Sequence, residues 1–321
     1  MRMRMRTLFN TTLMAAAFTL PAASAGAAPL PDLPTRLATH VRAIASSEHN
    51  TGTPAALEKA ALYLEATLAA QGYAVRRDEY VYDGHKVRNL EVSIANTATG
   101  KQPERVYIVG AHYDSAPGTP GANDNGSGTA AVLELARMLK GVVPAPGNEL
   151  RFVLFVNEEP PYFGGPGMGS RHHARALKAS GQNVKAALIL ETIGYYSDAK
   201  NSQSYPPGIS AFYPNQGNFI TFVGTLGSAG LVRRTVSAFR EASTFPAEAL
   251  AAPSFVKGVT WSDHTSYNLE GYEALMITDT AIMRYPHYHT SADTPDKLDY
   301  ASMAKVVEGL SKVTTAMIKS Q

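Results

Sequence analysis

Four short stretches of the chain are almost continuously apolar instead of alternating between apolar and polar residues. They are residues 105–111, 150–156, 186–190 and 273–278. A strand of this kind is buried on both faces, as in the middle of a sheet that helices cover on both sides. Helical patterns at 128–141 and 170–181 separate the first three stretches. This alternation predicts an α/β fold, a three-layer α/β/α sandwich with a central mixed, mostly parallel β-sheet.

Three further segments have clear local signals. A helix is predicted from Thr53, a suitable N-cap residue, to Gly72, a typical helix stop. Residues 73–96 alternate in polarity and carry an Asp-Gly pair in the middle, so they predict a β-hairpin. A last amphipathic helix is predicted at 300–320.

The first 27 residues are typical of an export signal. Three arginines are followed by an apolar core, and small-residue cleavage sites occur at 23–25 and 25–27. The apolar core is shorter than the ~20 residues that span a bilayer. The chain has no cysteine, which excludes a lipoprotein anchor and a disulfide framework. We therefore expect a signal peptide at 1–27, a single domain at 28–321 and a periplasmic or extracellular location.

The charge balance gives no reason to expect a polyanionic partner. The whole chain has 29 basic and 27 acidic residues, a formal net charge of +2. The predicted signal holds three arginines and no acid, so its removal changes the net charge to −1. We expect neither nucleic-acid binding nor stable association with a membrane.

Residue types that bind metal ions follow the apolar stretches. They are His112 and Asp114 after the first stretch, Glu158 and Glu159 after the second, Glu191 after the third, and Asp279 after the fourth, with His287 and His289 soon afterwards. In open α/β sheets ligands bind outside the carboxyl ends of the strands, so four strands would deliver these side chains to one edge. Histidine and carboxylates without cysteine favour zinc or manganese in a catalytic site. The pattern predicts metal-assisted hydrolysis.

Asp124 lies in a loop, 118–128, that is rich in glycine and asparagine. Such a loop bends easily, so it can place a carboxylate between two metal ions. Glu158 and Glu159 are adjacent and point in different directions at a strand end. One of them can bind metal while the other takes the proton of the activated water.

Five motifs occur in order along the chain. They are GAHYDS, GANDNGSG, FVNEE, MGS and PHYHTSADT. Together they resemble the zinc aminopeptidase family, metallopeptidase family twenty-eight, which includes aminopeptidase Y and bacterial leucyl aminopeptidases and is related to glutamate carboxypeptidases and glutaminyl cyclases. The resemblance implies the zinc exopeptidase fold and a secreted zinc-dependent aminopeptidase that acts on peptide or protein N-termini.

The same resemblance implies the metal ligands. His112 would bind the first zinc ion, Asp124 would bridge both ions, and Glu159 and His289 would bind the second. Glu191 departs from the pattern, since the family usually has Asp as the last ligand of the first zinc ion. Two Zn²⁺ ions per chain are expected, and the longer side chain of Glu191 leaves one ion as the alternative.

The resemblance also implies three supporting roles. Glu158 would be the general base and then the acid for the leaving amine. Asp114 would orient the ring of His112. Tyr288 would help to stabilise the oxyanion of the tetrahedral intermediate.

Several polar residues have more than one interpretation. The spacing of His287 and His289 does not choose between them, and the resemblance chooses His289. Asp263 and His264 form either a hydrogen-bonded structural pair or part of a pocket next to the site. Two pairs of basic residues, at 172–173 and 233–234, are expected to be solvated on helix surfaces.

The sequence excludes one other activity and leaves further alternatives open. A serine hydrolase is excluded because no G-x-S-x-G motif occurs. A zinc carboxypeptidase would need a cationic pocket, for which Arg284 is the candidate near His289. A glutaminyl cyclase-like acyltransferase would use one zinc ion, and an inactive metal-binding homologue is the non-enzymatic alternative. The oligomeric state stays open.

Overall fold

Eight strands form one sheet in the order β1-β2-β4-β3-β5-β8-β6-β7 in a computed structural model that describes residues 30–320. The strands are β1 (Arg76–Tyr82), β2 (His85–Ala95), β3 (Arg105–His112), β4 (Asn148–Phe155), β5 (Val184–Leu190), β6 (Ile220–Thr225), β7 (Ala247–Ala252) and β8 (Ala274–Thr278). The pairs β3–β4, β3–β5, β5–β8 and β6–β7 are parallel, and β1–β2, β2–β4 and β6–β8 are antiparallel. The predicted mixed, mostly parallel sheet is confirmed.

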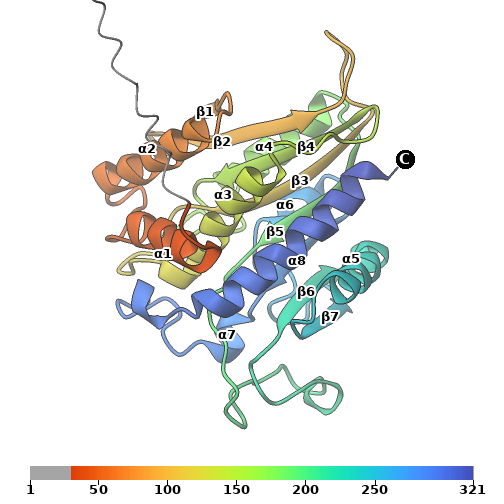
Figure 1. Ribbon diagram of the computed structural model, residues 1–321. Coiled ribbons are helices and arrows are strands. Elements are labelled where there is room, and N and C mark those ends of the chain that lie inside the picture. Colours follow the sequence, from red (N-terminus) through yellow and green to blue (C-terminus); the bar gives the residue numbers. More distant parts are fainter. Residues whose placement is uncertain (1–29, 321) are drawn as a thin grey trace, which may run out of the picture. The chain divides into compact units, whose positions relative to one another are not determined.

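Helices cover both faces of this sheet (Figure 1). They are α1 (Leu33–Ile44), α2 (Pro54–Ala70), α3 (Gly128–Leu139), α4 (Gly169–Ala179), α5 (Ala229–Ala242), α6 (His264–Leu269), α7 (Ala281–Arg284) and α8 (Tyr300–Lys319). Helices α1, α3 and α8 pack together on one face, and α4 and α6 pack on the other. The predicted signal at 1–27 lies outside the described residues. No described helix has the length and apolar character needed to cross a bilayer.

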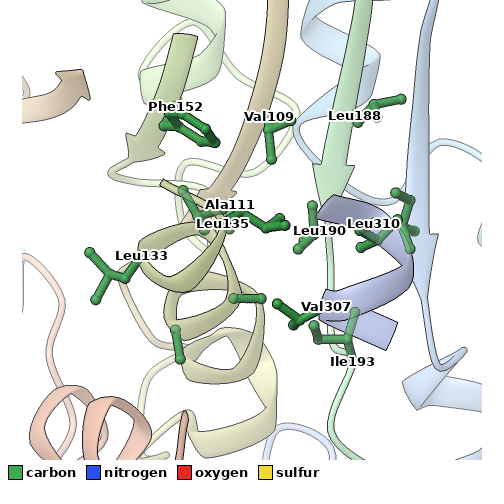
Figure 2. Close-up of a cluster of buried hydrophobic side chains, with 14 of the residues drawn as sticks. Val109, Ala111, Leu133, Leu135, Phe152, Leu188, Leu190, Ile193, Val307 and Leu310 are labelled. Atoms are coloured by element: carbon green, nitrogen blue, oxygen red, sulfur yellow. The ribbon is translucent and has the colours of Figure 1, made fainter. Parts of the chain in front are cut away.

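The central strands are buried on both faces, as their continuous apolar sequence predicts. Val109 of β3 and Leu188 of β5 pack in the core under α3 and α8, where Leu135 and Leu310 meet them (Figure 2). The neighbouring strand positions, such as Ile108, belong to a second core under α4 and α6. Each large aliphatic side chain buried in this way contributes about 1.5–3 kcal/mol. The sheet is therefore fixed from both sides, which gives its strand ends defined positions.

The predicted N-terminal helix, β-hairpin and last helix are confirmed as α2, β1–β2 and α8. Helix α2 begins at Pro54 directly after Thr53, and Gly72 stops it with a left-handed φ of 84°. The hairpin β1–β2 turns at Asp83 and Gly84, which have φ angles of 50° and 76°. Positive φ at both central residues matches the twist of an antiparallel ribbon.

The expectation for the basic pair at the start of α4 is wrong for His173. Its side chain is buried, and its ring nitrogens lie 2.7 Å from Glu91 Oε2 and 2.8 Å from the hydroxyl of Tyr267. His173 faces the sheet because α4 packs on β2 with this side. His172, one position further round the helix, is partly exposed and stacks on Tyr80.

Candidate metal centre

The candidate metal-binding residues lie where parallel strands end side by side. His112 is the last residue of β3 and pairs with Phe155, the last residue of β4. Glu191 directly follows β5, whose other neighbour is β8. Because β3, β4, β5 and β8 run in one direction, their carboxyl ends form one edge. This edge holds the side chains that the sequence pattern placed there.

Left-handed residues follow three of these strands at the same distance. Asn157, Thr192 and Thr280 each lie two positions after the last residue of β4, β5 and β8, with φ angles of 62°, 49° and 67°. A non-glycine residue in this conformation costs free energy and persists where the surrounding structure enforces it, commonly at functional sites. Each of these residues turns the chain at a strand end. Two of the turns lie directly beside Glu158 and Glu191, which stay at the edge.

His112 lies at the centre of one group of carboxylates. Its Nε2 atom is 3.4 Å from Asp124 Oδ1, 3.3 Å from Glu191 Oε2 and 3.8 Å from Glu158 Oε2. All four side chains are buried. The longer side chain of Glu191 therefore places its carboxylate next to the same histidine that Asp124 contacts.

His289 lies at the second side of Asp124. Its Nε2 atom is 3.0 Å from Asp124 Oδ2 and 3.3 Å from Glu159 Oε2. Asp124 thus presents one oxygen to each of two histidines. His289 has a φ of 54°, while His287 contacts the ring of Tyr285 and is not in this group.

The chemistry of this cluster fits a metal cation. Two triads, His112–Asp124–Glu159 and His112–Glu158–Glu191, have ligand atoms within 4.8 Å of one another. The buried Nε2 of His112 and Oε1 of Glu159 have no hydrogen-bond partner among the described residues. Nitrogen and carboxylate donors without sulfur suit zinc in a catalytic site.

The electrostatics of the carboxylates point the same way. Burial and, to a smaller extent, the charge of the nearby Asp124 raise the pKa of Glu159 to about 7 and that of Glu191 to about 8, against the opposing effect of His112. Buried like charges at this distance are unfavourable unless protons or cations balance them. A divalent cation would replace those protons.

Asp114 fixes the backbone that carries the two glutamates. Its Oδ1 accepts the N–H of Glu158 at 3.1 Å, and its Oδ2 accepts the N–H of Glu159 at 3.2 Å. The Nδ1 atom of His112 lies 3.1 Å from the carbonyl oxygen of Asp114 and 3.6 Å from its carboxylate. Asp114 therefore contacts three members of the cluster.

Asp293 is a supporting residue that the sequence reasoning did not single out. Its carboxylate accepts the N–H of Asn123 at 2.8 Å and that of Asp124 at 3.1 Å, and the hydroxyl of Tyr285 donates to it at 2.8 Å. The available signal was its place in PHYHTSADT, four residues after His289. Asp293 holds the loop that carries Asp124.

Asp279 and Glu191, both at this edge, have different surroundings. Asp279 is outside the cluster and accepts hydrogen bonds from the Asn123 amide at 2.9 Å and from the N–H of Tyr195 at 2.8 Å. Glu191 Oε2 accepts a hydrogen bond from the hydroxyl of Ser262 at 2.8 Å. The latter bond defines the direction of the Glu191 side chain.

Asp263 and His264 are both fully buried at the start of α6, but no hydrogen bond joins them. The His264 Nε2 atom pairs with the carbonyl of Val259 at 2.8 Å, and the carboxylate of Asp263 lies near the side chain of Ser170. Burial raises the pKa of Asp263 to about 7 and lowers that of His264 to about 4. Of the two interpretations from the sequence, the hydrogen-bonded pair does not describe this arrangement.

A cavity that is open to solvent lies next to the cluster. Glu191 and Tyr288 belong to its lining, so the cluster and the cavity share a wall. Apolar side chains predominate elsewhere, among them Phe219, Leu250 and Trp261. Neither Asp263 nor His264 lines it. A pocket with this apolar lining and a few polar groups is typical of small-molecule or side-chain binding.

Comparison with known proteins defines the class to which this fold and site belong. The model of the family described as "Peptidase family M28" matches residues 93–314. The chain therefore belongs to peptidase family M28 and is a metallopeptidase by family, which confirms the predicted resemblance.

The chain is similar to individual bacterial and fungal proteins. The chain is 38% identical over 263 residues to "Uncharacterized protein YfbL" of Escherichia coli (strain K12), a match that covers 79% of this chain and 78% of that protein. It is 30% identical over 232 residues to "Probable leucine aminopeptidase 1" of Trichophyton verrucosum (strain HKI 0517), over 68% of this chain and 56% of that protein. The chain thus spans little more than half the length of this aminopeptidase relative.

Solved structures share the fold. The LapA aminopeptidase of Legionella pneumophila matches with a TM-score of 0.71 and 19% identity, over 89% of this chain and 72% of that chain. The Fimbriiglobus ruber glutaminyl cyclase matches with a TM-score of 0.64 and 21% identity, over 92% of this chain and 99% of that chain. The zinc exopeptidase fold is confirmed by this likeness.

Proposed function

We propose that the chain is an exported, zinc-dependent aminopeptidase that releases N-terminal amino acids from peptides. One observation carries the proposal: a buried, carboxylate-rich cluster contributes Glu191 to the lining of a largely apolar cavity, to which Tyr288 also belongs. The cavity can take the side chain of a terminal residue while the carboxylates attract its ammonium group. The printed name of the Trichophyton relative supports the same activity.

The residues that would hold zinc are His112, Asp124, Glu191, Glu159 and His289. When bound, zinc supplies a Lewis acid that polarises the scissile carbonyl and lowers the pKa of water. Asp124 offers an oxygen to each side of the cluster, so it is the residue suited to bridge two ions.

Glu158 would move the proton of the attacking water. Burial raises the pKa of its carboxyl group well above the usual value, although the charge of His112 acts to lower it. The carboxylate accepts the water proton as the oxygen bonds to the carbonyl carbon, and returns it to the amine nitrogen as the C–N bond breaks. Asp114 keeps Glu158 in place through its backbone N–H. Tyr288, on the shared wall, would donate a hydrogen bond to the oxyanion.

The surroundings of Arg284 do not support a carboxypeptidase. Its guanidinium is buried and donates to Gln203 Oε1 at 2.8 Å and to the carbonyl of Phe219 at 2.9 Å. Arg284 does not line the cavity.

The proposed activity is tested by substrates that differ only at the amine. Leucine 4-nitroanilide with a free amine should be hydrolysed, and the N-acetylated form should not. Hydrolysis of both forms would contradict an aminopeptidase. Release of ammonia from an N-terminal glutamine peptide would instead identify a glutaminyl cyclase-like acyltransferase, whose fold the chain shares. N-terminal sequencing of the protein from periplasm and medium tests export, with a start near residue 26 or 28 expected.

A further inference from the structure

The apolar cavity has one wall that carries threonines. Thr221 of β6 pairs directly with Thr278 of β8, and Val223 pairs with Met276 two positions away. All four line the cavity. Directly opposed residues on antiparallel strands project to the same face. Strands β6 and β8 therefore present a pair of threonines to the cavity, followed by a pair of apolar side chains.

Thr221 is the unpaired member of this wall. The hydroxyl of Thr278 lies 3.0 Å from that of Thr192 and accepts the N–H of Thr280 at 2.8 Å. Gln203 pairs with the hydroxyl of Thr280. Within residues 30–320, Thr221 is the one residue of the cavity lining whose buried side-chain polar atom lacks a hydrogen-bond partner.

The position of Thr221 suits the far end of a long side chain. Strand β8 lies between β5, which leads to Glu191, and β6. Two strand spacings of about 4.8 Å place Thr221 roughly 10 Å across the sheet from Glu191, the member of the cluster that lines the cavity. A side chain whose backbone sits at the cluster would pass the apolar walls before it reaches this hydroxyl.

We propose that Thr221 is a specificity-determining residue that selects an N-terminal residue with a long, mainly apolar side chain and a hydrogen-bonding group at its end, tyrosine above phenylalanine or leucine. The inference rests on the aminopeptidase function proposed above. The phenol hydroxyl would pair with Thr221, whereas phenylalanine fills the same space and leaves the threonine hydroxyl unpaired. A site with a buried polar group discriminates against a ligand that cannot pair with it.

The first test compares kcat/KM for tyrosine, phenylalanine and leucine 4-nitroanilides. The wild type should favour tyrosine over phenylalanine by about tenfold, and Thr221→Val should abolish this ratio. Thr221→Ser keeps the hydroxyl and should keep the ratio. Thr235→Val is the matched control, because Thr235 is buried on α5 and its hydroxyl donates to the Leu231 carbonyl.

The second test measures binding of the free amino acids by calorimetry, with and without zinc, and needs no turnover. L-Tyrosine should bind more tightly than L-phenylalanine to the wild type, and equally to Thr221→Val. Equal binding and equal turnover in the wild type, or an unchanged ratio in Thr221→Val, would overturn the assignment of Thr221. A binding difference that Thr221→Val removes, without hydrolysis of any free-amine substrate, would support the role of Thr221 and contradict the aminopeptidase function.

Discussion

The carboxylate of Asp114 accepts the backbone N–H of Glu158 at 3.1 Å, so the residue that follows β3 fixes the residue that follows β4. Its second oxygen does the same for Glu159. The proposed proton carrier and a proposed metal ligand therefore share one anchor. The geometry of the site depends on this carboxylate even where it binds neither metal nor substrate.

Replacement of Asp114 by alanine should lower both zinc affinity and turnover by about 10–100-fold, as for other residues that orient metal ligands. The two N–H groups would lose their acceptor in a buried position. Zinc titration with a competing chelator and kcat measurements check the change. Asp114→Asn keeps one acceptor oxygen, so its zinc affinity and kcat should lie between those of the wild type and Asp114→Ala. Wild-type zinc affinity in Asp114→Ala would contradict the anchoring role.

Glu158→Gln should retain zinc and lose about 10²–10⁴-fold in kcat, because the amide cannot accept the water proton. Metal content per chain, measured beside the rate, separates loss of the base from loss of the metal. Retained activity would place the general base elsewhere.

Zinc content should be two ions per chain, and Glu191→Ala should reduce it to one. Glu159 and His289 lie on the other side of Asp124 and keep their contacts in this variant. Elemental analysis after dialysis measures the count. His287→Ala is the control, since His287 lies outside the cluster, and it should leave two ions bound.

Chelation should inactivate the enzyme and lower its melting temperature, and added zinc should restore both. A ligand that binds only the folded state stabilises it by about 2.7 kcal/mol at one hundred times its Kd. Activity that is unaffected by prolonged chelation would exclude a metal-dependent reaction.

The stability of the fold at acid pH should depend on Glu91, which contacts the buried His173. Burial acts to raise the pKa of Glu91, but hydrogen bonds from His173 and Arg76 outweigh it and hold the pKa at about 2, below the usual 4.5. Because the folded-state pKa is depressed, this carboxylate stabilises the fold fully above about pH 4.5 and progressively less toward pH 2.

Urea unfolding at several pH values checks this dependence. Glu91→Gln should be less stable than the wild type at pH 6, and the difference should shrink as the pH falls from about 4.5. Glu308→Gln, on the exposed face of α8, is the control and should follow the wild type. A constant difference between wild type and Glu91→Gln across this range would contradict the role of Glu91.

The central part of the fold was predictable because burial on both faces requires apolar residues at every position. Val109 and Ile108 enter different cores, yet both must be apolar. Strands β6 and β7 were not singled out, since their sequences carry threonine, glutamate and alanine and lack a continuous apolar run. Their places in the sheet depend on pairing partners far away in the sequence.

The members of the cluster were predictable from strand ends and motifs, but their mutual contacts were not. Nothing local to Asp293 indicates that it accepts the N–H of Asp124, because that bond joins residues 169 positions apart. The burial of His173 was missed for a similar reason. Its orientation depends on which side of α4 meets β2, and polar partners on β2 and α6 make a buried histidine acceptable.

The bond between Asp293 and the loop of Asp124 also has a consequence for the order in which the protein becomes active. During synthesis, the residue proposed to bridge the metal ions emerges long before the segment that orients it. A nascent chain therefore lacks a complete catalytic constellation until almost all of its residues have been made. The hydrolytic capacity of this molecule is tied to completion of its own folding.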